Sequence, residues 1–210
     1  ITHTDGYPIQ PFEAESVVLG MGERYDAVIT AGDGAFAVVA EALGKQDQAV
    51  AVLRTGSGSA PAKDAKLPQT KAPATAADLK AIDAVALPQR AADRTLVLEL
   101  TGGMEKYDWA INGKRMDMEQ PMRDALGLKE GERVALEFKN STKMWHPMHL
   151  HGHTYQHPGG GPRKDTSIVL PGKTLRVEFD ADNPGRWLSH CHNVYHGEAG
   201  MMTTIAYQQG

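Results

Sequence analysis

The sequence predicts an all-β protein, in which a complete Greek-key β-sandwich over residues 94–210 follows part of a second domain of the same kind. Two observations lead to this prediction. Short runs of apolar residues, alternating or continuous, recur along the chain, and such runs are typical of strands. Turn-forming Gly, Pro, Asn and Asp residues separate the runs, as the loops of a sandwich require.

The first part of the chain, residues 1–55, contains short strand-like runs after a turn at residues 4–8. The runs lie at residues 16–19, 25–30, 35–40 and 49–53. A closed sandwich of this kind has about seven strands, and these residues supply fewer. We therefore expect residues 1–55 to be the C-terminal part of a middle domain whose first half lies outside them.

The segment 56–93 has a different composition, rich in Gly, Ser, Ala, Pro, Lys and Asp and with little periodicity. Such a composition is typical of an exposed linker. Its length favours a crossing between two domains over a loop within one. Residues 76–82 could form one short helix.

The last part, residues 94–210, has the strand-like runs of a complete domain. The runs lie at residues 95–100, 133–140, 166–170, 173–179 and 202–207. Asn112-Gly113 predicts a tight hairpin turn, because both positions of such a turn need a positive φ. This order of runs suits a Greek-key sandwich with functional residues on loops at one end.

Composition excludes several classes of partner. The chain has 210 residues and a net charge of −4, so no polyanion such as a nucleic acid is suggested. A single cysteine excludes a disulfide framework, and no apolar run is long enough to span a membrane. The chain begins at Ile1 within strand-like sequence, so a targeting segment could have been lost.

The segment 190–201 carries the strongest functional signal. It contains the only cysteine, Cys191, together with His196 and Met201 at fixed spacing. A thiolate, two imidazoles and a weak thioether are the ligand set of a blue-copper electron-transfer site. These residues would supply all but one imidazole, and the histidine-rich segment 146–153 offers several candidates for it.

Strand alternation predicts a second metal site next to the first. Successive side chains of a strand point to opposite faces, so Cys191 faces one way while His190 and His192 face the other. His149 and His151 are also two residues apart and share a face. We expect these four imidazoles to converge on an all-histidine site.

Both segments together resemble a known family. HPMHLHGH at 146–153, followed by HCH-x3-H-x4-M at 190–201, resembles the C-terminal copper motifs of the multicopper oxidases, the class of laccases and bilirubin oxidases. The resemblance implies cupredoxin-like domains and a type 1 copper bound by His146, Cys191 and His196, with Met201 as axial ligand. It also implies that type 2 and type 3 coppers are bound by His149, His151, His190 and His192.

The resemblance implies an activity and its partners. A small reducing substrate (a phenol, an aromatic amine or a metal ion) would give electrons to the type 1 copper, and a trinuclear copper cluster would reduce dioxygen to water. We expect the imidazole edge of His146 or His196 to lie at the surface and carry the electron in. Glu198 is a candidate proton donor, with a plain surface role as the alternative. A secreted or periplasmic location is implied by the resemblance alone.

One part of the family pattern is missing. The family supplies the other half of its cluster from HxH motifs in an N-terminal domain, and outside the segments 146–153 and 190–192 no HxH motif occurs here. We therefore expect an N-terminal cupredoxin domain, in cis or in another chain, to complete the cluster. Two alternatives stay open: a one-copper electron-transfer module without oxygen chemistry, and a structural zinc domain.

The remaining histidines fit no ligand role in the family pattern. His153 has the strand parity of a ligand, and we interpret it as a residue of the core or one that supports the ligands. For His157 and His3 we expect surface positions. Segment 20–26, GMGERYD, resembles a stretch late in the middle domain of three-domain multicopper oxidases.

Overall fold

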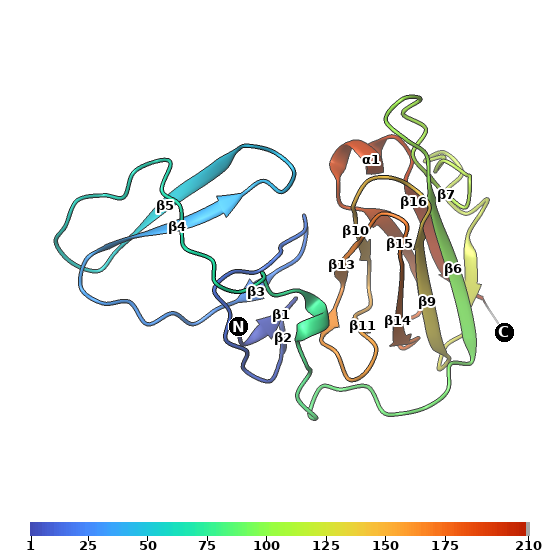
Figure 1. Ribbon diagram of the computed structural model, residues 1–210. Helices are drawn as coiled ribbons and strands as arrows, with labels where there is room; N and C mark the ends of the chain where they lie inside the picture. The colour runs from blue at the N-terminus through green and yellow to red at the C-terminus, as the bar shows by residue number, and fades with distance from the viewer. Residues whose placement is uncertain (209–210) are drawn as a thin grey trace.

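The computed structural model describes residues 1–208 and divides into a small N-terminal part and a β-sandwich, which lie side by side (Figure 1). Helical structure in these residues is confined to the five-residue helix α1 (Val194–Glu198) and the single 3-10 turn η1 (Ala76–Asp78). The prediction of an all-β protein is therefore confirmed.

Two sheets form the sandwich, and one of them carries the histidine-rich segments. Its five strands lie in the order β13 (Thr166–Val169), β10 (His146–Leu150), β15 (Arg186–Cys191), β16 (Met202–Tyr207) and β8 (Leu126–Leu128). All neighbours pair antiparallel except β16 and β8.

The other sheet has six strands. Their order is β12 (Arg163–Lys164), β11 (Tyr155–Gln156), β14 (Thr174–Asp180), β9 (Arg133–Asn140), β6 (Arg94–Thr101) and β7 (Ala110–Ile111). Strands β6 and β9 pair in parallel, so the chain crosses to the first sheet between some neighbours, as Greek-key connections do.

The core lies between these sheets. Alternation in β6 and β14 points one row of apolar side chains inward, and β9 is buried along most of its length. Phe138, Met148, Leu150, Tyr155 and Phe179 are fully buried there. Cys191 and Met201 belong to the same apolar cluster, so the first predicted metal site sits at one end of the core.

The N-terminal part consists of two small sheets. One is three-stranded, in the order β2 (Tyr7–Pro8), β1 (His3–Thr4) and β3 (Tyr25–Asp26). The other is the hairpin β4 (Ala35–Glu41) and β5 (Gln48–Arg54), which extends away from the sandwich (Figure 1). Its strands expose apolar side chains such as Val38 and Val52.

The segment 56–93 connects the hairpin to the sandwich and contains little regular structure beyond η1. Part of it is packed rather than exposed: Ala74, Leu79 and Ala81 are buried. Ala74 forms a bridge with Val17, and Ala81 forms one with Ile9. The amide of Ala81 also donates to the carbonyl of Gly160 at 3.1 Å, so this stretch ties the N-terminal part to the sandwich.

Three local predictions are wrong in extent. Residues 16–19 form one isolated bridge instead of a strand, and the strand expected at 25–30 ends at Asp26. The helix expected at 76–82 is only η1, because Leu79 turns to an extended backbone with φ −99° and ψ 153°. None of the helices that the structure describes is long and apolar enough for a membrane crossing.

Candidate metal centre

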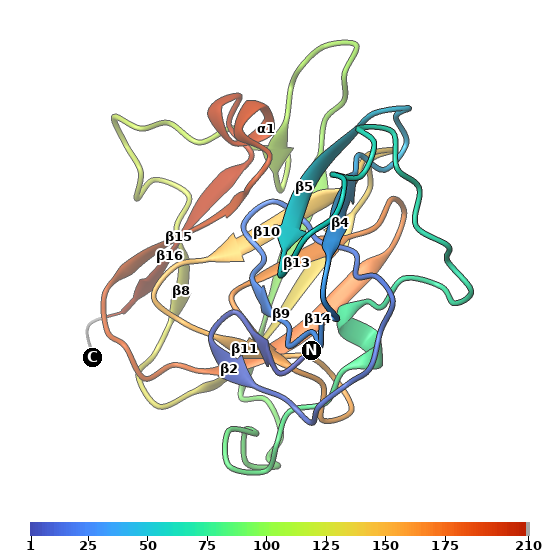
Figure 2. The same ribbon diagram turned by 90° about the vertical axis from the view of Figure 1, so that its left-hand side faces the viewer.

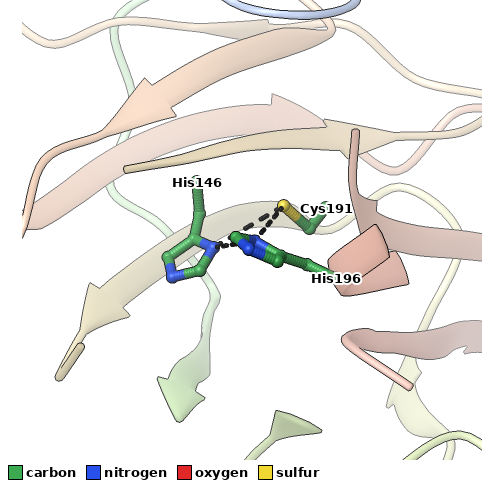
Figure 3. A group of neighbouring side chains, drawn as sticks. All are labelled: His146, Cys191 and His196. Carbon is green, nitrogen blue, oxygen red and sulfur yellow. Dashed lines mark hydrogen bonds between the residues drawn. The ribbon is translucent and has the colours of Figure 1, made fainter. Parts of the chain in front are cut away.

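Three donor atoms converge at one end of the sandwich core. The sulfur of Cys191 lies 3.6 Å from Nδ1 of His146 and 3.8 Å from Nδ1 of His196, and the two nitrogens are 3.1 Å apart (Figure 3). All three side chains are buried. A buried thiol between two imidazole nitrogens is the donor set of a blue-copper site.

Neighbouring strands and one short helix bring these donors together. His146 begins β10 and Cys191 ends β15, and these strands pair through Met148 and Cys191. The chain then turns into α1, where the Asn193 side chain accepts a hydrogen bond from the Tyr195 backbone and caps the helix. The helix carries His196 back toward Cys191.

Backbone hydrogen bonds close this loop onto Met201. The amide of Cys191 donates to the carbonyl of Met201 at 3.0 Å, and the amide of Met201 donates to the carbonyl of His196 at 3.0 Å. Gly200, with φ +118°, allows the sharp turn that precedes Met201. Met201 is fully buried, whereas Met202 is only partly so, as strand alternation predicts.

A hydrogen-bond chain determines which nitrogen of His146 carries the proton. The amide nitrogen of Asn140 donates to the carbonyls of Met144 (2.7 Å) and Val169 (3.0 Å), so its oxygen is the acceptor. The Thr142 hydroxyl donates to that oxygen at 2.8 Å. Thr142 Oγ1 must then accept from Nε2 of His146, 2.8 Å away. Nδ1 of His146 therefore keeps its lone pair, which is the form that binds a metal.

The charge states of His146, His196 and Cys191 also suit the binding of a cation. Burial and the neighbouring His196 lower the pKa of His146 to about 3, and burial lowers the pKa of His196. Burial raises the pKa of the Cys191 thiol to about 12. The imidazoles are therefore neutral ligands, and the thiol gives up its proton only to a positive ion among these atoms.

The imidazoles of this group are not at the surface. His146 is 0% exposed and His196 is 2% exposed, so the expectation of an exposed ligand edge is wrong for this chain. The indole of Trp109 covers both rings: its centroid lies 4.1 Å from that of His196 and 5.4 Å from that of His146.

A second group of histidines lies on the other face of the same strands. Donor atoms of His149, His151 and His190 lie within 4.8 Å of one another. His149 and His190 are cross-strand partners, and Nε2 of His151 is 3.0 Å from Nε2 of His190. The ring of His192 is 5.4 Å from that of His149 and 5.3 Å from that of His190. All four predicted imidazoles therefore gather here.

Hydrogen bonds fix two of these histidines with Nε2 toward the group. Nδ1 of His149 lies 2.9 Å from the carbonyl oxygen of Asp165, and Nδ1 of His190 lies 3.1 Å from the carbonyl oxygen of Cys191. A carbonyl can only accept, so Nδ1 carries the proton in both rings and Nε2 is free to bind a metal. Burial lowers the pKa of His190, which favours the neutral ligand form.

The N-terminal part supports His149 through Asp165. The Arg24 guanidinium binds both carboxylate oxygens of Asp165 at 2.6 Å. The Asp5 carboxylate accepts from the backbone amides of Asp165 (3.0 Å) and Thr166 (3.2 Å). Although burial opposes it, the hydrogen bonds from Arg24, His149 and Thr166 hold the pKa of Asp165 below its ordinary value.

Charged groups are buried beneath this contact. Lys164 is 0% exposed, and its Nζ lies 3.2 Å from Asp5 and 3.3 Å from Glu23. The same ammonium group stands 4.6 Å from the centre of the Tyr25 ring. Burial raises the pKa of Glu23 despite the attraction of Lys164. The N-terminal part is thus joined to the sandwich by a buried ionic cluster.

His192 is held by a glycine of the N-terminal part. A Cβ at Gly22 would lie 2.5 Å from Cδ2 of His192, so the backbone of segment 20–26 packs directly on that imidazole. Gly22 also has φ +89°, where side chains are strained. The sequence gives no sign of this contact, because the two residues are far apart in the chain.

The other residues singled out in the sequence lie outside both groups. Glu198 is exposed, and its side chain forms no hydrogen bond or ion pair within residues 1–208. His153 is buried and bonds to the Tyr207 hydroxyl at 2.7 Å. His157 is also buried, with Nε2 2.8 Å from Ser167 Oγ, so the expectation of a surface position is wrong for it. His3 is half-buried and lies 3.5 Å from Asp26.

Comparisons with known proteins match both parts of the chain. A family model described as multicopper oxidase matches residues 89–210, and a second one of the same description matches residues 1–58. The multicopper oxidase MmcO of Mycobacterium tuberculosis is 43% identical over 212 residues, covering 99% of this chain and 41% of that protein. Copper resistance protein A of Escherichia coli is 39% identical over 120 residues, covering 55% and 19% respectively. The chain thus spans less than half the length of these relatives.

Solved structures agree on the fold. Fet3p, a multicopper oxidase that functions in iron import, superimposes with a TM-score of 0.79 at 17% identity, covering 99% of this chain and 51% of Fet3p. The laccase from Botrytis aclada has a TM-score of 0.77 at 20% identity, covering 97% and 46%. At these identities the likeness shows the fold, and the predicted cupredoxin-like class is confirmed.

Proposed function

This chain belongs to the multicopper oxidase family, and from that membership we propose that it forms the C-terminal copper-binding region of an oxidase that takes electrons from a small donor and delivers them to dioxygen. One observation carries the proposal. Cys191 lies in the first donor group. Its two neighbours in the chain, His190 and His192, both lie at the second group. A single strand end would thus join an electron-accepting site to an oxygen-reducing one.

The ligand sets follow from the two groups. His146, Cys191 and His196 would hold one copper, with the thioether of the buried Met201 as the weak fourth ligand. His149, His151, His190 and His192 would hold part of a cluster of three coppers. When bound, copper supplies one-electron transfer at the first site and the reduction of dioxygen to water at the second.

The surrounding residues fix the position and protonation state of the ligand imidazoles and exclude water from them. Asn140 and Thr142 hold the proton of His146 on Nε2, and Asp165 holds that of His149 on Nδ1. Burial of His146 and His196 keeps water from the first group. These contacts keep each lone pair directed at a metal position before the metal arrives, which strengthens binding and sets the geometry.

Half of the cluster would come from outside these residues. By family resemblance, four further histidines in a second pair of HxH motifs complete it, and residues 1–210 hold HxH motifs only in the segments 146–153 and 190–192. The hairpin β4–β5 supports the same conclusion, because it exposes Phe36, Val38 and Val52 without further strands beside it. Isolated two-stranded hairpins are marginal in water. We infer that an N-terminal cupredoxin domain, in cis or in another chain, completes the cluster, and that further strands outside these residues cover the exposed face of the hairpin.

The donor is proposed as a phenol, an aromatic amine or a metal ion. Relatives of this chain include proteins named laccase and iron transport multicopper oxidase, as well as copper resistance protein A. A secreted or periplasmic location and a proton-donor role of Glu198 are proposed on the family resemblance alone.

The decisive test compares this chain with Cys191→Ser after loading with copper. The chain should become blue, and the variant should bind copper without the intense blue absorption. Neither should sustain oxygen consumption with a phenolic donor until an N-terminal region with HxH motifs is added. A blue Cys191→Ser variant contradicts the ligand assignment, and a colourless loaded chain favours the zinc alternative.

The copper content decides between the two copper readings. A one-copper electron-transfer module would bind a single copper per chain and would gain no oxygen consumption from an added N-terminal region. The proposed oxidase region would bind further copper when that region is present. Sustained four-electron reduction of dioxygen by a verified monomer of this chain alone would contradict the need for a second half.

A further inference from the structure

The first metal site has no ligand edge at the surface through which a donor could reach it. His146, Cys191, His196 and Met201 are all at most 2% exposed. We propose that Tyr107 and Trp109 form the electron-entry route, with Tyr107 as the docking point for an aromatic donor and Trp109 as the bridge to His196. This inference rests on the proposed function and adds an entry site to it.

Trp109 is the inner half of the route. Its indole lies nearly parallel to the His196 ring, at an interplanar angle of 33° and a centroid distance of 4.1 Å. It meets His146 edge-on at 5.4 Å and 70°. The side chain is 1% exposed, and its buried Nε1 has no hydrogen-bond partner within residues 1–208. A buried tryptophan usually finds such a partner. Because Trp109 has none here, its position is explained by the packing of its ring against the imidazoles.

Tyr107 is the outer half. Its ring meets that of Trp109 edge-on, at 6.4 Å and 76°, and the side chain is 39% exposed. Its backbone has φ +54°, a conformation rare for a bulky residue. The amide of Tyr107 donates to the Gly103 carbonyl at 2.8 Å, and the amide of Gly103 donates to the Asp108 carboxylate at 3.1 Å. The loop therefore holds Tyr107 in place despite an unfavourable backbone.

The surface around Tyr107 suits an aromatic donor. The loop between β6 and β7 rises beside α1 at the same end of the sandwich (Figures 1 and 2). This loop exposes Met104, and α1 exposes Val194 and Tyr195. Apolar and aromatic side chains bind flat, weakly polar rings through stacking and burial of apolar area. These side chains offer a phenol or aromatic amine a stacking surface, beside the exposed charged residues Glu105, Lys106 and Asp108 of the same loop.

The proposed transfer removes one electron and one proton from the donor. A phenol at Tyr107 loses one electron, and its hydroxyl proton passes to water, which leaves a neutral phenoxyl radical. The electron crosses the ring of Trp109 to His196, and a Cu(II) ion held by His196 and its partner ligands would be the one-electron acceptor. No bond of the protein forms or breaks. The aromatic rings shorten the distance that the electron must cross through saturated atoms.

Trp145 offers the competing route and therefore the matched control. It is 44% exposed and directly precedes His146 in the chain. Its ring forms no aromatic contact with either imidazole within the described part of the chain. Entry by the shortest covalent path would use Trp145, whereas entry by ring contact would use Trp109.

The test measures anaerobic reduction of the copper-loaded chain by a phenol, followed as loss of the blue absorption. Trp109→Leu and Tyr107→Ala each remove the ring and should each slow it severalfold while the blue band is retained, and Trp145→Leu should leave the rate as it is. A second readout needs no donor: Cu(II) should quench tryptophan emission in the wild-type chain more than in Trp109→Leu.

The outcomes separate this inference from the proposed function. Without a blue band in the wild-type chain, the copper site itself is wrong. With a blue band, an unchanged rate in both Trp109→Leu and Tyr107→Ala overturns the route, as does a loss confined to Trp145→Leu. Should Trp109→Leu fail to fold, Tyr107→Ala still decides, because the Tyr107 ring is 39% exposed and is not part of the core.

Discussion

The hydroxyl oxygen of Thr142 lies 2.8 Å from Nε2 of His146 and can only accept a hydrogen bond there, because its own proton goes to Asn140. Replacing Thr142 by Val keeps the shape and removes the acceptor. The buried Nε2–H is then unpaired, and the proton can move to Nδ1, the ligand atom. We expect copper affinity to fall by about 10- to 100-fold.

Two measurements check this prediction. In the metal-free chain, nitrogen NMR of the His146 ring should show the Nε2–H form in the wild type and a mixture in Thr142→Val. Copper titration should give the loss of affinity. Thr142→Ser retains the hydroxyl and serves as the control; an equal loss in both variants would show that the threonine methyl group matters instead.

Local patterns predicted the parts of this molecule that depend on short-range rules. The alternation of His190, Cys191 and His192 follows from strand geometry, and the structure places Cys191 at the end of β15 facing the core. Asn112 and Gly113 have φ +52° and +69°, as the predicted hairpin turn requires. Such features need only the sequence within a few residues.

Contacts between distant segments could not be predicted in the same way. Asp5 and Lys164 are charged, and charged residues are usually exposed; only the fold brings them together and buries them. Trp109 carries no sequence sign that its ring will cover His196. The expectation of an exposed imidazole failed for this reason, because a separate loop supplies the cover.

The buried ionic cluster predicts a large loss of stability on removal of one charge. In Lys164→Met, the buried carboxylate of Glu23 would lose its cation, and that of Asp5 would keep only Arg24, 3.6 Å away. We expect the free energy of unfolding to fall by about 3–5 kcal/mol, measured by urea unfolding of the metal-free chain. The added change Glu23→Gln should restore part of it.

Arg176→Ala is the control for this experiment. Arg176 forms an ion pair of 2.7 Å with Glu137 and is 44% exposed. Exposed pairs contribute about 0–1 kcal/mol. A loss in Lys164→Met no larger than in Arg176→Ala would show that the buried cluster does not hold the two parts together.

His157 predicts a pH dependence of stability. Burial, with Lys164 nearby, lowers its pKa to about 4 from an ordinary value of 6.5. The unfolded chain takes up this proton as the pH falls through about 6.5, whereas the folded chain resists until about 4. The contribution to stability is therefore complete above pH 6.5 and is lost between 6.5 and 4, by about 3 kcal/mol at most.

His157→Gln should remove that contribution. Unfolding of the metal-free chain at a series of pH values should show a shallower decline between pH 6.5 and 4 in the variant than in the wild type. His3→Gln, which removes a half-buried histidine elsewhere, is the comparison. Parallel declines in wild type and His157→Gln would contradict the prediction.

Gly22 predicts a defect confined to the second donor group. A methyl group at this position would press on the His192 ring, 2.5 Å from Cδ2, and would meet an unfavourable backbone at φ +89°. Gly131 has φ +84° with nothing within 4 Å of an added Cβ, so Gly131→Ala tests the backbone strain alone. Both variants should lose about 1–2 kcal/mol of unfolding free energy from that strain.

Only Gly22→Ala should shift the His192 ring signals in NMR and weaken copper binding at the all-histidine group, while the blue absorption of the first site stays unchanged. Identical His192 signals in Gly22→Ala and wild type would show that the imidazole does not depend on this contact.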